Sequence, residues 1–262
     1  MNNPSCEHTR RFLRKRKSLA WVCCLLPFLF GCVAGMPQIP NSPDDILKSG
    51  DVHFQQGKYY QSGELYKAFL ARHPGHDRSD YAQFMLGESY FADKDYALAA
   101  VEYRILVTNY GYSEYVDDGY LKEALCLHKQ APKSVLDQSK NRDALSKLER
   151  FVQIFPRSSL MPVAVEHINI IKRVLAEKEL AAALFYIGRK RVDSALIYLD
   201  KIISEYRDNE FWVRALYHKA IIDIERGRED DAIRLLSQVL AYPDDLDVKA
   251  EATILMGQLR GN

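Results

Sequence analysis

The chain has 262 residues, of which 47% are hydrophobic and 27% are charged. This composition is sufficient for a folded core and excludes a disordered or collagen-like chain. The formal net charge is +1, but residues 1–31 hold six basic residues and one acidic residue. The remainder therefore has 30 basic and 34 acidic residues, a charge of −4. Because the basic character belongs to the N-terminal segment, no nucleic-acid partner is expected.

The N-terminal segment has the two parts of an export signal. The basic stretch Arg10–Lys17 runs directly into the apolar stretch Leu19–Phe30. Positive charge stays on the cytoplasmic side while the apolar part enters the bilayer. The apolar run reaches the lower limit for a spanning helix, so an uncleaved signal anchor is the alternative interpretation, against which Pro27 argues. The twin arginines, Arg10 and Arg11, leave a twin-arginine export signal as a further alternative.

The apolar stretch ends in Leu29-Phe30-Gly31-Cys32, which resembles the lipobox of bacterial lipoproteins. That resemblance implies removal of residues 1–31, acylation of Cys32 and anchoring of the mature chain by lipid. Val33 in place of aspartate after the cysteine implies sorting to the outer membrane. Residues 32–43, with three prolines, are expected to form the lipidated end and an extended tether. Cys126 then has no disulfide partner within the mature chain, and its apolar neighbours predict a buried thiol.

From residue 44 onward, small, aromatic and apolar residues recur at helical spacing. Five units share a small residue near the start of their second helix: Ser62, Ala99, Ala144, Ala195 and Ala232. These residues lie 37, 45, 51 and 37 positions apart. An aromatic residue or a leucine follows each small residue four positions later: Tyr66, Tyr103, Leu148, Leu199 and Leu236. In the first two units a glycine, Gly50 or Gly87, lies twelve positions before the small residue. A small residue allows two helices to approach closely, and the residue four positions on fills the adjacent gap.

These units resemble the tetratricopeptide repeat, whose period is about 34 residues. A single helix pair cannot bury its apolar face, so the pairs must stack. The prediction is an all-α fold, a right-handed α-solenoid of about five tetratricopeptide-like helix pairs over residues 44–262. The N-terminal repeats would span residues 44–156 and the C-terminal repeats residues 157–262. Met161–Gly188 is predicted to be one long helix that projects from the solenoid or joins its two halves, and residues 130–139 are predicted to form an exposed loop.

A more specific resemblance rests on several segments: Tyr115–Cys126, Asp137-Gln138, Ala144, Phe151, Phe155-Pro156, Ser158, Leu175–Ala181, Phe185-Tyr186 and Ala195. Together with the lipobox they resemble the BamD (ComL) family of outer-membrane assembly lipoproteins. The resemblance implies a non-catalytic scaffold of the β-barrel assembly complex, held by lipid at the periplasmic face of the outer membrane. It implies three kinds of partner: a BamA-like β-barrel insertase, the other lipoproteins of the complex, and unfolded outer-membrane proteins.

The resemblance also indicates where these partners would bind. The insertase contact is expected on the fourth and fifth repeats, around Tyr206, Arg207, Phe211 and Trp212. Packing of Phe211 and Trp212 in the core is the alternative interpretation. First helices are expected to receive client proteins through four aromatic residues: Phe54, Tyr81, Phe84 and Tyr90. Packing within the repeats is the alternative for most tyrosines.

Motifs typical of enzymes and metal sites give no support to a catalytic or metal-binding role. The sequence has no phosphate-binding loop, dinucleotide fingerprint or nucleophile elbow. His73 and His76, with Asp77 and Asp80 nearby, are the only close histidine pair, and they lie where a polar turn is expected. Neither catalysis, a cofactor nor a metal is therefore expected. Two alternative hypotheses remain: another periplasmic tetratricopeptide lipoprotein, such as a secretin pilotin or an envelope–peptidoglycan coordinator, and an enzyme or metal-binding protein built on helical repeats.

Overall fold

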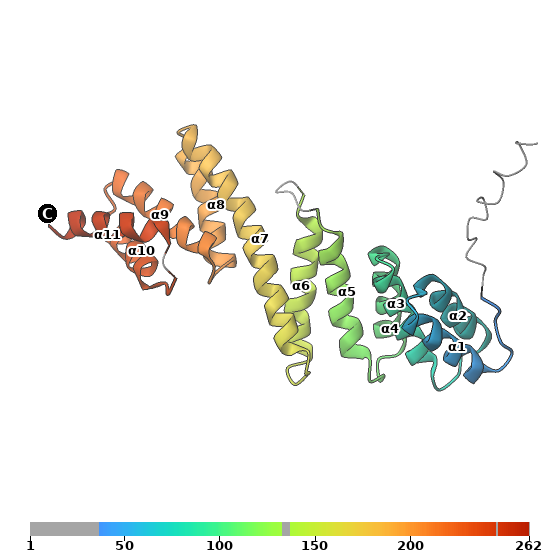
Figure 1. The fold of residues 1–262 in the computed structure, drawn as a ribbon. Helices are drawn as coiled ribbons and strands as arrows, with labels where there is room; N and C mark the ends of the chain where they lie inside the picture. The colour runs from blue at the N-terminus through green and yellow to red at the C-terminus, as the bar shows by residue number, and fades with distance from the viewer. Residues whose placement is uncertain (1–36, 133–136, 245, 262) are drawn as a thin grey trace, which may run out of the picture. The chain divides into compact units, whose positions relative to one another are not determined.

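The structure is a computed structural model that describes residues 37–132, 137–244 and 246–261. The predicted signal sequence and Cys32 lie outside these ranges. The described residues form eleven α-helices and no strand (Figure 1). The helices are α1 (Pro43–Gln55), α2 (Tyr59–Arg72), α3 (Ser79–Ala92), α4 (Tyr96–Asn109), α5 (Val116–Gln130), α6 (Ser139–Ile154), α7 (Met161–Gly188), α8 (Val192–Glu205), α9 (Glu210–Glu225), α10 (Glu229–Ala241) and α11 (Asp247–Arg260). Within these ranges, no helix combines the length and the hydrophobicity needed to cross a bilayer.

Each helix packs mainly against the next helix along the chain. The pairs α1/α2, α3/α4, α5/α6, α7/α8 and α9/α10 contain the five predicted repeat units. The all-helical solenoid predicted from the repeats is therefore confirmed. Helix α11, the last helix in the described ranges, packs against α10 and α9. The repeat pattern did not predict this last helix.

The first two pairs show why their first helices carry a glycine opposite the buried tyrosine. A Cβ atom at Gly50 would lie 2.9 Å from the ring of Tyr66, and one at Gly87 would lie 2.7 Å from the ring of Tyr103. Both rings are completely buried. Ser62, the small residue of the first unit, donates a hydrogen bond from its hydroxyl to the carbonyl of Gly50, with an O–O distance of 2.9 Å. Close approach of the two helices in a pair thus depends on the small residues that define the repeat.

The phenolic hydroxyls of the same two tyrosines are also satisfied. Tyr66 donates to Oδ1 of Asp51 over 2.6 Å, and Tyr103 donates to Oε1 of Glu88. In each pair the acceptor is the residue directly after the glycine. A buried hydroxyl requires such a partner. Burial, reinforced by the neighbouring carboxylate, raises the pKa of both tyrosines well above the usual value.

Four of the five pairs share a tight turn with a left-handed residue at its centre. Gly57 and Gly227 occupy this position in the first and fifth pairs, with φ of 73° and 71°. Lys94 and Lys190 occupy it in the second and fourth pairs, with φ of 66° and 58°. Glycine adopts this backbone freely, whereas a residue with a Cβ is strained by about 1–2 kcal/mol. The geometry of the helix pair therefore imposes the left-handed backbone even where the residue is a lysine, which adopts it less readily than glycine.

The third pair has a longer connection in place of the tight turn. The predicted exposed loop at residues 130–139 includes residues 133–136, which lie outside the described residues, and its ends, Gln130 and Ser139, belong to α5 and α6. The prediction is also wrong for Gln138, whose relative exposure is 1%. Its amide nitrogen donates to the carbonyl of Pro132 over 3.3 Å, and its amide oxygen accepts from Nδ2 of Asn141 over 2.5 Å. Gln138 is buried because its side chain supplies hydrogen bonds to the loop backbone and to α6.

Helix α7 is the long helix predicted from the sequence, with 28 residues and a proline in its first turn. It packs against α6, α8 and α9. Its buried residues, among them Ile171 and Leu175, belong to a core cluster that also includes residues of α5, α6, α8 and α9. Helix α7 therefore joins the third pair, through α6, to the fifth pair, through α9, as its length led us to expect.

Candidate binding surfaces

Three aromatic side chains from α3 and the turn before α5 form what we term the aromatic cluster: Tyr81, Phe84 and Tyr115. The rings of Phe84 and Tyr115 are stacked, with centroids 4.8 Å apart and an interplanar angle of 10°. The rings of Tyr81 and Tyr115 lie 6.0 Å apart. All three side chains are half-buried. They present an aromatic surface to which a further ring could pack.

Polar contacts hold Tyr81 in this cluster. Its hydroxyl donates to Oδ1 of Asp51 over 2.6 Å, the same oxygen that accepts from Tyr66. The guanidinium carbon of Arg78 lies 4.9 Å from the centre of the Tyr81 ring. Burial, followed by the hydrogen bond to Asp51, raises the pKa of Tyr81. The ring is thus fixed by contacts to α1, and its hydroxyl stays protonated near neutral pH.

The four predicted client-binding residues do not form one surface. Tyr81 and Phe84 lie together, whereas Phe54 packs edge-on against Tyr59 at the end of α1, with centroids 5.3 Å apart. Tyr90 lies near the other end of α3, where Nζ of Lys67 is 5.6 Å from its ring centre. Sequence reasoning missed Tyr115 because this residue lies in the turn before α5. It follows Tyr81 by 34 positions, and this repeat period could have identified it.

The predicted insertase-binding residues lie at the turn between α8 and α9. Asn209 caps α9, because its Oδ1 accepts from the backbone nitrogens of Phe211 and Trp212 over 3.0 and 3.1 Å. Phe211 and Trp212 are half-buried and pack against the core, and Nε1 of Trp212 donates to the carbonyl of Ile203 over 3.3 Å. Arg207 is exposed. Arg207, Phe211 and Trp212 therefore each keep part of their surface accessible to a partner.

Tyr206, unlike Arg207, Phe211 and Trp212, is buried, which contradicts the prediction that its side chain is exposed for contact with the insertase. Its relative exposure is 3%, and it belongs to the core cluster around α7. Burial, with smaller effects from Glu205 and Glu179, raises its pKa. Because so little of the ring is exposed, Tyr206 packs as part of the core beneath the turn.

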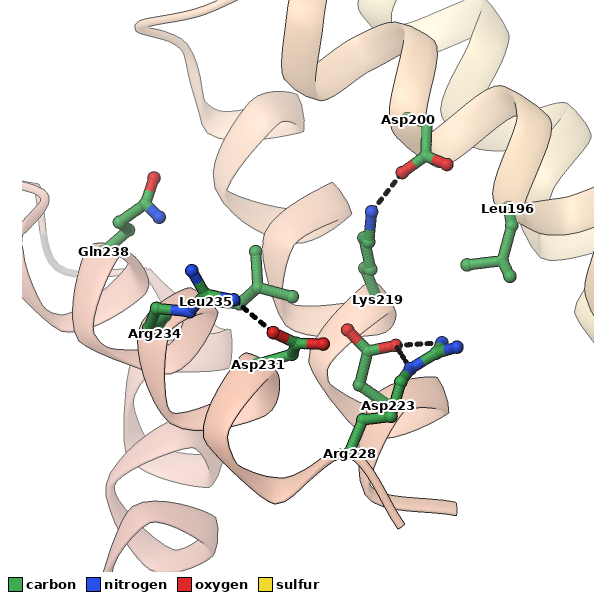
Figure 2. Close-up of a pocket in the computed structure, with 9 residues that line it drawn as sticks. All are labelled: Leu196, Asp200, Lys219, Asp223, Arg228, Asp231, Arg234, Leu235 and Gln238. Carbon is green, nitrogen blue, oxygen red and sulfur yellow. Dashed lines mark hydrogen bonds and ion pairs between the residues drawn. The ribbon is translucent and has the colours of Figure 1, made fainter. Parts of the chain in front are cut away.

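A groove of about 500 Å³ runs between α8, α9 and α10 and is lined by charged residues (Figure 2). Its three cation–carboxylate pairs are Lys219 with Asp200, Arg228 with Asp223, and Arg234 with Asp231. Each basic side chain that lines this groove therefore has its own aspartate. All three carboxylates in the lining of this groove are held in ion pairs.

The surroundings of His73, His76 and Cys126 indicate that these residues have structural roles. The rings of His73 and His76 are 6.5 Å apart, and both contact Phe69. Nδ1 of His76 lies 2.7 Å from Oδ1 of Asp77. In the described part of the chain, no group of three or more His, Cys, Asp or Glu residues is arranged to hold a metal ion. Cys126 is buried, and burial raises the pKa of its thiol to about 12, so it stays protonated.

Comparison with known proteins places this architecture in a family. Residues 40–237 match the model of the YfiO family, described as outer membrane lipoprotein. The outer membrane protein assembly factor BamD of Pasteurella multocida (strain Pm70) is 24% identical over 219 residues, which cover 78% of this chain and 82% of the relative. BamD of Rickettsia prowazekii (strain Madrid E) is 22% identical over 221 residues, which cover 82% of this chain and 88% of the relative.

Among solved structures, a TPR repeats protein from Bacteroides fragilis NCTC 9343 matches with a TM-score of 0.50. Its sequence identity is 11%, and the match covers 85% of this chain and 99% of that protein. This likeness concerns the fold alone and agrees with the stacked helix pairs. The family description and the names of the curated relatives agree with a protein that is not an enzyme. The family match extends from before α1 into α10, and the chain therefore belongs to the YfiO family of outer membrane lipoproteins.

Proposed function

We propose that this protein is a non-catalytic scaffold lipoprotein of the outer-membrane β-barrel assembly complex. The observation that carries the proposal is the family match over residues 40–237 together with curated relatives named BamD. In this proposal Cys32 carries the lipid, and residues 44–262 act at the periplasmic face of the outer membrane. The N-terminal repeats, residues 44–156, would receive clients, and the C-terminal repeats, residues 157–262, would hold the insertase.

The insertase-binding surface is proposed at the turn between α8 and α9. Arg207 is exposed there, and the half-buried Phe211 and Trp212 lie beside it. Asn209 fixes the first turn of α9 with two hydrogen bonds, so the aromatic side chains are held in place before a partner binds. Large aromatic residues beside an arginine suit a binding hot spot, because they lose little conformational entropy on binding.

The client-binding surface is proposed at the aromatic cluster of Tyr81, Phe84 and Tyr115. An unfolded outer-membrane protein would present an extended segment that ends in an aromatic residue. The stacked rings of Phe84 and Tyr115 offer a flat apolar face to such a residue. The Tyr81–Asp51 hydrogen bond holds the neighbouring ring in a fixed position.

Depletion of the protein in its native host tests the assembly role. A general assembly subunit predicts a simultaneous decrease of many β-barrel proteins in the outer membrane, measured by quantitative proteomics of isolated membranes. Re-expression of the unchanged gene should restore all of them and serves as the control. Loss of a single secretin, with other β-barrel proteins at normal abundance, would contradict the proposal and indicate a pilotin.

A further inference from the structure

A second groove, between α4, α5 and α6, has a volume of about 460 Å³ and differs in charge from the groove of Figure 2. We term it the cationic groove. Four basic residues line it: Arg104, Lys140, Lys147 and Arg150. Asp143 is the single acidic residue in its lining, and Tyr120 contributes an aromatic wall.

A buried carboxylate lies beneath two of the basic residues. The side chain of Glu123 is only 3% exposed. Nε of Arg104 lies 2.8 Å from one of its oxygens, and Nζ of Lys147 lies 2.9 Å from the other. A buried carboxylate requires such pairing to offset its desolvation. Because two cations share one anion, this group retains one positive charge.

The other two basic residues are unpaired. Lys140 and Arg150 form no ion pair with any described residue. With Asp143 and Glu123 counted, the four cations leave a formal charge of +2 in the groove. The groove of Figure 2, in contrast, has an aspartate for each of its three cations. The chain after residue 31 has a net charge of −4, so the cationic groove is a positively charged site on a protein whose net charge is negative.

The spacing of the unpaired cations indicates the size of the ligand. Lys140 and Arg150 are ten residues apart on α6. At about 1.5 Å per residue this corresponds to roughly 15 Å along the helix. About four to five residues of extended chain span the same distance. The half-buried ring of Tyr120 provides apolar contact along this path.

We propose that the cationic groove binds a short acidic segment of a protein partner, with carboxylates placed at Lys140 and Arg150. An extended segment matches the length of the groove, which a single small anion would not. The ion pair with Glu123 holds the Lys147 side chain inside the groove, where it is 32% exposed. The four cations therefore do not all project outward, as contact with a flat membrane would require. The proposal uses charge and shape alone and is independent of the role proposed above.

A labelled model peptide tests the proposal directly. The probe is a fluorescein-labelled, twelve-residue Gly/Ser peptide that carries four glutamates, and the comparison peptide carries four glutamines in their place. Fluorescence anisotropy is measured with the full-length protein in an uncharged detergent. We expect binding of the glutamate peptide only, and its loss at about 0.5 M salt because ions screen exposed charges. Equal binding of both peptides, or binding of neither, would overturn the proposal.

Two substitutions locate the site. K140Q/R150Q removes the unpaired cations and leaves the Glu123 pairs intact, so we expect the peptide to bind about five- to tenfold more weakly. The matched control K48Q/R260Q removes two positive charges from exposed residues of α1 and α11 that form no ion pair with a described residue, and it should leave affinity unchanged. An equal loss in both double variants would place binding elsewhere and refute the proposal.

Replacement of the buried carboxylate gives an effect of opposite sign. Glu123→Gln frees Arg104 and Lys147 from their shared anion, so we expect the glutamate peptide to bind more tightly. Unchanged or weaker binding by a folded Glu123→Gln protein would contradict the proposed site. A membrane partner is the competing outcome: anionic phosphatidylglycerol vesicles would bind, K140Q/R150Q would abolish that binding, and the peptide would not bind.

Discussion

Replacing Gly87 by alanine tests the packing that underlies the repeat. The new Cβ would lie 2.7 Å from Cε1 and 2.9 Å from Cδ1 of Tyr103, closer than atoms in a folded core approach one another. The ring cannot move away easily, because it is fully buried and its hydroxyl is bonded to Glu88. In this position alanine acts as an overpacking substitution.

Two opposing contributions set the expected magnitude. Alanine in place of glycine stabilises a helix interior by about 0.8–1.0 kcal/mol. Overpacking a rigid core costs about 1–3 kcal/mol. We therefore expect Gly87→Ala to lower the free energy of unfolding by up to about 2 kcal/mol, with helix propensity offsetting part of the clash.

The chain offers a matched control for this substitution. Gly257 lies in α11, and a Cβ there would have no atom within 4 Å. Gly257→Ala should therefore stabilise the protein by about 0.5–1 kcal/mol, because only helix propensity acts. Urea unfolding followed by far-ultraviolet circular dichroism measures both, and hydrogen exchange at α3 and α4 shows whether the loss is local. If Gly87→Ala stabilises the protein as much as Gly257→Ala, the packing argument is refuted.

Three further predictions concern pH, client binding and localisation. Burial lowers the pKa of His218, so below about pH 6.5 the unfolded state binds more protons than the folded state. The free energy of unfolding should therefore decrease as the pH is lowered from about 7 to about 5. His218→Gln should flatten this dependence in urea titrations, and an unchanged slope would count against it. Phe84→Ala should weaken binding of a peptide ending in phenylalanine about two- to tenfold by fluorescence anisotropy, because one stacked ring is lost, whereas the control Phe54→Ala should not. Cys32→Ser should give a folded protein absent from the outer membrane in fractionated cells, and retention there with unchanged mobility would contradict a lipid anchor.

The helical repeat could be predicted because its signal is steric and local. Ser62 and Ala99 mark positions where only small residues allow two helices to approach, and this requirement is visible as a period. The long helix α7 could be predicted for a similar reason, since Pro162 favours its start and Gly188 its end. Helix α11 has no such marker, because the small-residue spacing that defines the five pairs does not extend to it, although it packs against α10 and α9.

The binding surfaces could be predicted less well, because exposure depends on contacts between distant segments. Tyr206 and Arg207 are adjacent, yet the first is enclosed by the core around α7 and the second is exposed. Gln138 is buried because of its bonds to Pro132 and Asn141, which its polar character does not reveal. The left-handed backbone conformation of Lys190 likewise shows that the geometry of a helix pair can override the conformational preference of a single residue.

The central claim is that this protein is a scaffold of the β-barrel assembly complex, and affinity capture tests it most directly. The tagged, lipidated protein would be purified from gently solubilised envelopes of its native host, and its partners identified and quantified by mass spectrometry. The account predicts stoichiometric recovery of a β-barrel insertase with periplasmic repeat domains, and reduced recovery with Arg207→Glu at the turn between α8 and α9. Recovery of a secretin or of peptidoglycan-associated proteins, without such a barrel, would contradict it.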